Sequence, residues 1–274
     1  MDVVHNILGG LQSKGTASAL SAFLSVSLYV TYLFVDYSAT NVPSKLLMPS
    51  YDFIVVGGGS AGAVLASRLS EIEDWNVLLL EAGGDGSVIY DIPLLAPNLQ
   101  LSEIDWKYKT EPSKNYCRGG YLTIEESEWH TPLADAFLGA GREMGYENRD
   151  INGERQTGFM IAQATIRHGS RCSTGKAFLR PASARKNLHV AMHAHVTKIL
   201  IDPSSKRAYG VEFFRDGRTL RVHANKEVIV SAGSINSPQL LMLSGIGPEE
   251  HLAEHGIPVI RNLSVGHNLQ DHVV

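Results

Sequence analysis

The sequence holds little cysteine, little net charge and no zinc-protease motif, and each shortage excludes a class of protein. Two cysteines, Cys117 and Cys172, make neither a disulfide framework nor, on their own, a zinc site. The 24 lysines and arginines are scattered among 28 aspartates and glutamates, so the basic patch of a nucleic-acid-binding protein is missing. The 11 histidines include no H-E-x-x-H motif, and we predict no metal site.

What is present is a globular composition, 44% hydrophobic and 19% charged, with one long apolar run. From Gly15 to Val35 there is no charge over 21 residues, which is enough to span a bilayer and also suits a secretory signal. We predict that residues 1–40 are a signal peptide or membrane anchor. Five serines and threonines from Ser18 to Thr31 favour a cleaved signal and a secreted protein, with membrane association through residues 15–35 as the alternative. The sequon at Asn262 is compatible with that route.

The first ordered unit after a polar, turn-rich linker at residues 41–50 is a β-α-β pattern. Tyr51–Val56 is a nearly continuous apolar run, as expected of a strand buried on both faces. Ser60–Glu71 has apolar residues at helical spacing, and Asn76–Leu80 is a second buried-strand run. A strand, a helix and a strand in this order must cross over right-handed into a parallel sheet.

The rest of the chain alternates shorter patterns. We predict strands at residues 121–124, 188–192, 196–201, 208–214, 219–223 and 227–231. We predict helices at residues 131–144 and 235–243, and a loop at residues 146–158. The tetrapeptide R-D-G-R at residues 215–218 predicts a hairpin, since Asp-Gly is a strong signal for a type I′ turn.

Three glycines between the first strand and the first helix predict a nucleotide site. Gly57, Gly59 and Gly62 form G-x-G-x-x-G, which permits a tight turn, close approach of the backbone to a diphosphate and close helix–strand packing. The helix N-terminus adds N–H groups and partial positive charge for the phosphates. Glu81 ends the next strand, 19 residues after Gly62, where a carboxylate meets ribose hydroxyls and disfavours a 2′-phosphate. The spacing therefore predicts a dinucleotide other than NADP.

The same letters also match another strand–turn–helix motif. Residues 58–62 read G-G-S-A-G, the G-x-S-x-G nucleophile elbow of α/β-hydrolases, in which Ser60 would be the nucleophile. An elbow normally follows several strands and an oxyanion loop, whereas only the leader and the linker precede Ser60. A hydrolase also gives Glu81 no role, so this reading is a remote alternative.

Longer stretches extend the motif beyond its glycines. IVVGGGSAGAVLASRLSE…NVLLLEAGG, within residues 54–84, resembles the amino terminus of the glucose–methanol–choline (GMC) flavoprotein oxidoreductases. GSINSPQLLMLSGIGP at residues 233–248 is similar to the second signature of that family, and VGHNLQDH at residues 265–272 to the segment after it. DWKYKTEP at residues 105–112 and RCSTGKAFLRPA at residues 171–182 are further matches. The resemblance covers about residues 50–274 and is closest to insect secreted glucose-dehydrogenase-like members.

The resemblance implies an α/β fold, with an FAD/NAD(P)-binding Rossmann-like domain and a partial α+β substrate-side region. Residues 51–117 and 187–274 would form the FAD-binding domain, and residues 118–186 a remnant of the substrate-side region. FAD is the implied cofactor, with its adenosine ribose at Glu81 and its adenine at the backbone of Val196. By the same resemblance, the diphosphate of FAD would be held by Gly57, Gly59, Ser60, Ala61 and Gly62. The turn after a later sheet strand would lie near the ADP half of FAD, at Ser231, Ala232 and Gly233.

The family implies oxidation of a CH–OH group of an alcohol or sugar by hydride transfer to flavin, with a quinone or oxygen as electron acceptor. Two departures bear on that chemistry. Members carry a flavin-covering segment resembling R-G-K-x-x-G-G-S-S-x-x-N after the region of Cys117, where this chain runs straight into Arg118. The family's C-terminal catalytic pair lies beyond Val274, so no catalytic residue is assigned. We expect a chain that is inactive as it stands, with a non-catalytic secreted nucleotide-binding or interaction protein as the alternative.

Overall fold

The computed structural model describes residues 41–84, 121–126, 130–167 and 169–270. The leader at residues 1–40, the match at residues 105–112 and the junction between Cys117 and Arg118 lie outside the described residues. Within the described ranges, no helix has the length and apolar character that a membrane crossing requires.

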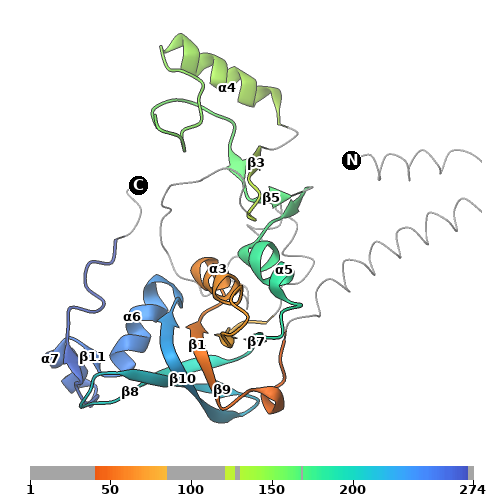
Figure 1. The fold of residues 1–274 in the computed structure, drawn as a ribbon. Coiled ribbons are helices and arrows are strands. Elements are labelled where there is room, and N and C mark those ends of the chain that lie inside the picture. Colours follow the sequence, from red (N-terminus) through yellow and green to blue (C-terminus); the bar gives the residue numbers. More distant parts are fainter. Residues whose placement is uncertain (1–40, 85–120, 127–129, 168, 271–274) are drawn as a thin grey trace, which may run out of the picture.

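A six-stranded sheet forms the body of the molecule (Figure 1). From one edge to the other its strands are β7 (Leu188–Ala191), β2 (Val77–Leu80), β1 (Ser50–Val56), β10 (Arg218–Val230), β9 (Ala208–Arg215) and β8 (His195–Ile201). Neighbours from β7 to β10 are parallel, whereas β10, β9 and β8 form an antiparallel meander. The predicted parallel β-α-β start is confirmed, and the fold is α/β.

Helices and short strand pairs make up the rest of the described structure. Within the described residues the helices are α3 (Ser60–Leu69), α4 (Pro132–Glu143), α5 (Arg180–Ala182), α6 (Gly233–Leu243) and α7 (Glu249–Glu254), with a 3-10 turn η1 (Ser44–Leu46) and a π-helical turn η4 (Gly175–Leu179). The short pairs join β3 (Glu125–Glu126) to β4 (Gln163–Ala164), β5 (Ile166–Arg167) to β6 (Ser170–Arg171), and β11 (Ile246–Gly247) to β12 (Arg261–Asn262). The helices predicted at residues 60–71, 131–144 and 235–243 are confirmed with ends shifted by one or two residues.

Strand β1 is buried on both faces, which explains its unbroken apolar sequence. Ile54 belongs to one hydrophobic cluster, which also contains Leu240 of α6. The neighbouring Val55 belongs to a second cluster, which contains Ala66 of α3. Because successive strand residues point to opposite faces, the two helices cover the sheet from both sides.

Two strands predicted at residues 219–223 and 227–231 are one strand, β10, and that prediction was wrong. Its first half pairs antiparallel with β9 and its second half parallel with β1. The polar stretch at residues 225–227 is exposed where the strand passes from one partner to the other, beside an irregularity in register between Tyr51 and Phe53 of β1. The predicted hairpin turn before it is confirmed, with positive φ at Asp216 (52°) and Gly217 (73°).

The strand predicted at residues 121–124 is also wrong. The pairing there belongs to β3, at Glu125–Glu126, whose antiparallel partner is β4. The position of a two-residue strand is determined by the distant strand with which it pairs. Two residues are too few to show the alternation of apolar and polar side chains by which a strand is predicted.

The segment predicted as a linker, residues 41–50, lies against the sheet. The N–H of Val42 donates to the carbonyl oxygen of Val190 at 2.7 Å, on the free edge of β7. The buried guanidinium of Arg215 donates to the carbonyl oxygen of Val42 and to Asn41 Oδ1, both at 2.8 Å. Residues 41 and 42 therefore cover part of the edge of β7, whose backbone groups are otherwise open to pairing with another strand.

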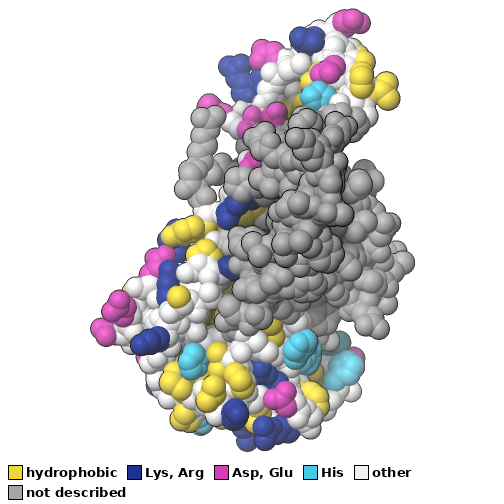
Figure 2. Space-filling model, turned by 90° about the vertical axis from the view of Figure 1, so that its right-hand side faces the viewer, with side chains coloured by type: hydrophobic (Ala, Val, Ile, Leu, Met, Phe, Trp, Pro, Cys, Tyr) yellow, Lys and Arg dark blue, Asp and Glu magenta, His cyan; other side chains and the backbone are white. Residues whose placement is uncertain are grey.

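Helix α4 lies apart from the sheet, at the top of Figure 1. Gly141 is its one buried residue, under the ring of Phe159, where an added Cβ would lie 2.6 Å from a ring carbon. Leu133, Phe137 and Met144 are exposed by 77%, 64% and 70%, and hydrophobic side chains are seen at the surface of this end in Figure 2.

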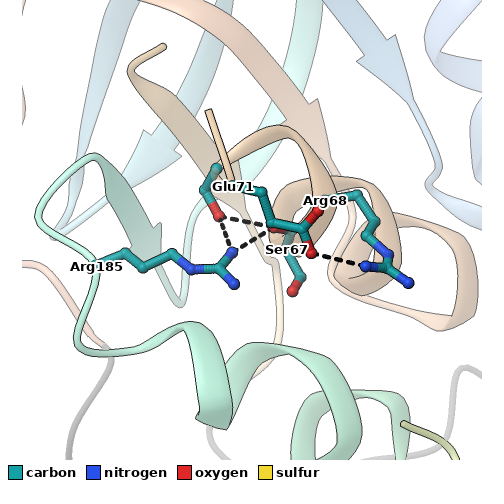
Figure 3. A network of polar contacts seen from close by, with 5 residues as sticks. Ser67, Arg68, Glu71 and Arg185 are labelled. Atoms are coloured by element: carbon teal, nitrogen blue, oxygen red, sulfur yellow. Dashed lines mark hydrogen bonds and ion pairs between the residues drawn. The ribbon is translucent and has the colours of Figure 1, made fainter. Parts of the chain in front are cut away.

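The C-terminal end of α3 is held by the segment between α5 and β7 (Figure 3). Arg185 reaches across to the carbonyl oxygen of Ser67 and, at 2.8 Å, to Ser70 Oγ. The neighbouring ion pair, at 2.7 Å, joins Arg68 in the last turn of α3 to Glu71, which follows the C-cap Ser70. A cation at a helix C-terminus interacts favourably with the helix dipole, so Arg185 helps to fix α3 in place.

Candidate functional site

A pocket of about 840 Å³ lies where the parallel strands β1, β2 and β10 reach their C-terminal ends. This is the position at which open α/β sheets bind ligands, and the volume is that of a cofactor pocket. Nine of the ten residues predicted for the cofactor line it: Gly57, Gly59, Ser60, Ala61, Glu81, Val196, Ser231, Ala232 and Gly233. The tenth, Gly62, is buried in α3 and does not line the pocket.

Glycine is needed for a different reason at each of the three motif positions. Gly57 has φ of +97°, and a Cβ there would lie 2.5 Å from the carbonyl oxygen of Ser231. A Cβ on Gly62 would lie 1.8 Å from the carbonyl oxygen of Gly57, so the turn and α3 pack too closely for any side chain. A Cβ on Gly59 would meet nothing within 4 Å. The protein's own packing therefore requires Gly57 and Gly62, whereas Gly59 leaves space beside the backbone for a ligand.

Two helices begin at this pocket, and no side chain of the described residues caps either of them. Gly59 is the N-cap of α3 and Ala232 is the N-cap of α6, and neither first turn contains an acidic residue. The first N–H groups of a helix have no partner within the helix, and the helix dipole is positive there. Both starts can donate N–H groups to an anion, and α3 presents them beside the open space at Gly59.

The carboxylate of Glu81 lies at the end of β2, beside the glycine turn. Its Oε2 accepts the N–H of Gly58 at 2.5 Å, and its Oε1 accepts the N–H of Gly83 at 2.7 Å. An ionised carboxylate offers about four lone-pair positions, so two remain for hydroxyl donors in the pocket.

The opposite wall comes from the edge strand β8. Val196 lies opposite Phe213 of β9, beside an irregularity in register between Val196 and Lys198. Because β8 is the last strand of the sheet, its backbone can offer N–H and C=O groups to whatever lies alongside it.

Several polar pocket residues were not predicted from the sequence: Thr197, Ser234, Asn236, Ser237 and Gln239. Four of them lie on α6, whose sequence S-I-N-S-P-Q-L-L-M-L shows no apolar stripe at helical spacing. The signal that could have found them is the run of polar residues in the first turns of a helix that follows a buried strand.

A parallel β-α-β unit with a glycine turn, an uncapped helix start and a carboxylate at the end of the second strand defines a Rossmann-type dinucleotide-binding domain. Residues 51–274 match the GMC oxidoreductase family, and the chain belongs to that family.

Two named proteins and one solved structure show which proteins this chain is similar to. The chain is 38% identical to glucose dehydrogenase [FAD, quinone] of Drosophila pseudoobscura pseudoobscura, over 81% of this chain and 48% of that protein. It is 34% identical to oxygen-dependent choline dehydrogenase of Staphylococcus epidermidis, over 82% of this chain and 52% of that protein. Among solved structures, pyridoxine 4-oxidase from Mesorbium loti is similar with a TM-score of 0.67 and 26% identity, over 78% of this chain and 55% of that one. The chain thus spans about half the length of the curated relatives it matches.

Proposed function

We propose that the pocket binds FAD through its ADP half, and that the chain is by descent an FAD-dependent oxidoreductase acting on CH–OH groups. The observation that carries this is the open space at Gly59, beside an uncapped α3 and within reach of the Glu81 turn. A diphosphate fits a place that combines bare backbone, unpartnered N–H groups and positive helix dipole.

Each part of the pocket has a proposed role toward FAD. The N–H groups of Ser60 and Ala61 donate to the diphosphate at the start of α3. Glu81 accepts from the ribose hydroxyls and repels a 2′-phosphate, which favours FAD over phosphorylated nicotinamide cofactors. The backbone of Val196 meets the adenine edge, and the start of α6 at Gly233 closes the ADP end.

The substrate class is proposed from the relatives. Their names specify a glucose dehydrogenase with FAD and quinone in one case, and an oxygen-dependent choline dehydrogenase in the other. Bound FAD supplies a hydride acceptor, which suits an alcohol or sugar donor and a quinone or oxygen as the final electron acceptor.

We also propose that residues 1–274 by themselves bind FAD without turning it over. Support comes from the sequence, in which the flavin-covering segment is missing between Cys117 and Arg118.

One experiment tests binding and turnover separately. The purified chain is titrated with FAD by flavin fluorescence and then assayed for dye reduction with glucose, choline and simple alcohols. We expect weak binding, of no more than one FAD per chain, and no substrate-dependent dye reduction. Alcohol-dependent reduction contradicts the inactive state, whereas a folded chain that takes up no FAD contradicts the proposed cofactor and favours the interaction-protein alternative.

Secretion is proposed from the apolar run at residues 15–35 and the sequon at Asn262. Expression in insect cells, followed by N-terminal sequencing of the medium fraction, tests it. We expect a start near residue 40 and a mass shift on glycosidase treatment. An intact Met1 in a membrane fraction indicates the anchored alternative instead.

A further inference from the structure

The peptide that joins Gly57 to Gly58 is held at both of its polar atoms. Its carbonyl oxygen lies 3.1 Å from Ser231 Oγ, which shares its hydroxyl proton with the carbonyl oxygen of Val56 at 3.0 Å. Its N–H donates to Glu81 Oε2 at 2.5 Å. The C=O and N–H of a trans peptide point in opposite directions, so two side chains grip one peptide plane from its two sides.

Without these two contacts, the plane of this peptide could rotate about its neighbouring backbone bonds. It joins two glycines, whose lack of a Cβ gives the backbone access to both signs of φ, and Gly57 already has φ of +97°. Rotation of the plane would exchange the directions of its C=O and N–H and would redirect the turn that leads into α3.

Ser231 fits the space beside this peptide closely. A Cβ on Gly57 would lie 2.5 Å from the carbonyl oxygen of Ser231, and a Cβ on Gly62 would lie 2.7 Å from its Oγ. The N–H of Ser231 donates to the carbonyl oxygen of Val56 at 2.8 Å, which continues the pairing of β10 with β1. The hydroxyl is therefore fixed in a gap between the turn and α3.

We propose that Ser231 is a positioning residue, which together with Glu81 clamps the Gly57–Gly58 peptide and so directs the first N–H groups of α3 into the pocket before any ligand binds. Because its proton goes to main-chain carbonyls, Ser231 acts through the turn and not by donating to a phosphate. This deepens the proposed function and rests on diphosphate binding at α3. Pre-organisation of this kind lowers the cost of ordering the site when a ligand arrives.

The test uses Ser231→Ala in the full chain, with ADP and adenosine as calorimetric probes. Ser183→Ala is the matched control, since Ser183 Oγ also donates to a carbonyl oxygen, that of Arg180 at 2.7 Å, at an exposed position away from the pocket. For Ser231→Ala we expect ADP to bind about 3- to 10-fold more weakly, as for the loss of one hydrogen bond, with adenosine affinity changed less than about twofold. Amide hydrogen exchange in the ligand-free protein should become faster in peptides covering residues 54–62, and should be unchanged in Ser183→Ala.

Each other outcome contradicts the clamp. Equal losses for ADP and adenosine indicate a general structural defect. A loss for ADP without faster exchange in the ligand-free chain indicates that Ser231 contacts the ligand directly. If Ser231→Ala does not fold, Glu81→Asp releases the other side of the same peptide, and unchanged exchange there overturns the proposal. Wild-type chain that binds neither ADP nor FAD rejects the proposed function, while the exchange measurement still decides the clamp.

Discussion

At the scale of single residues, the hydroxyl of Tyr51 is buried at the start of β1 and joins two distant segments. It accepts the N–H of Met48 at 3.0 Å and lies 2.7 Å from Nδ1 of His189 on β7. Burial raises the pKa of Tyr51, which keeps its proton, and burial lowers the pKa of His189 from its ordinary value of 6.5. A neutral imidazole with an unprotonated Nδ1 can accept the hydroxyl proton of Tyr51, and protonation of His189 removes that arrangement.

This pair predicts that the chain loses stability in mild acid. The pKa of His189 is lower in the folded state, so the unfolded state binds more protons as the pH falls below about 6.5. The stability that neutral His189 contributes is present above that pH and is lost below it. We expect the unfolding temperature, followed by circular dichroism, to decline less between pH 7.5 and 5.5 in His189→Gln than in the wild type. The exposed His223→Gln is the control, and equal slopes in all three proteins refute the prediction.

At the scale of elements, the turn from α3 to β2 depends on one amide. The two N–H groups of Asn187 Nδ2 are shared among the carbonyl oxygens of Ser70 at 3.2 Å, Ile72 at 3.0 Å and Trp75 at 2.9 Å. Asn187→Ala leaves these carbonyls without that donor, and we expect a loss of about 1–2 kcal/mol in the free energy of unfolding. Urea titration measures the loss. Asn225→Ala, on an exposed part of β10, should change stability by less than about 0.5 kcal/mol, and a similar loss in both variants contradicts this role of Asn187.

Elements with a strong local pattern could be predicted, and those set by distant partners could not. The run at β1 is apolar because both faces are buried, and the Asp216-Gly217 turn carries its own backbone preference. Strand β10 was divided in two because its exposed middle hides the change of partner from β9 to β1. Helix α6 was expected from composition, but its pocket-facing residues, such as Asn236, depend on its rotation over the sheet.

The residues of the cofactor site were predicted partly from the spacing of the glycine motif and partly from the family resemblance. Gly57, Gly59 and Glu81 follow from the motif alone, because the backbone geometry of a diphosphate turn fixes their spacing. The motif does not distinguish FAD from other dinucleotides, and the family resemblance supplied that distinction and the placement of Val196. The bond from Ser231 to the Gly57 carbonyl was visible to neither, since it links chain positions that only the sheet brings together.

At the scale of the whole molecule, the sheet is well buried and α4 is not. Leu133 and Phe137 of α4 and its C-cap residue Met144 lie on one side of the helix, at spacings of four and seven residues, and all are mostly exposed. Phe137 contacts the ring of Phe159 with centroids 5.2 Å apart, so it also holds the helix in place, whereas Leu133 and Met144 extend the stripe to both ends of α4. Exposed apolar side chains gathered on one side of a helix in this way promote association.

We therefore predict that the chain self-associates through α4 as its concentration rises. Leu133→Ser combined with Met144→Ser removes the two ends of the stripe and keeps Phe137 on Phe159, so the helix should stay folded. Sedimentation velocity over a concentration series should show a weaker rise in mean sedimentation coefficient for this double variant, with an unfolding temperature within about 2 °C of wild type. Arg142→Ser, on the opposite face of α4, is the control and should associate as the wild type does. If the double variant and the control associate equally, the contact lies elsewhere, and the stripe is exposed without joining copies of this chain.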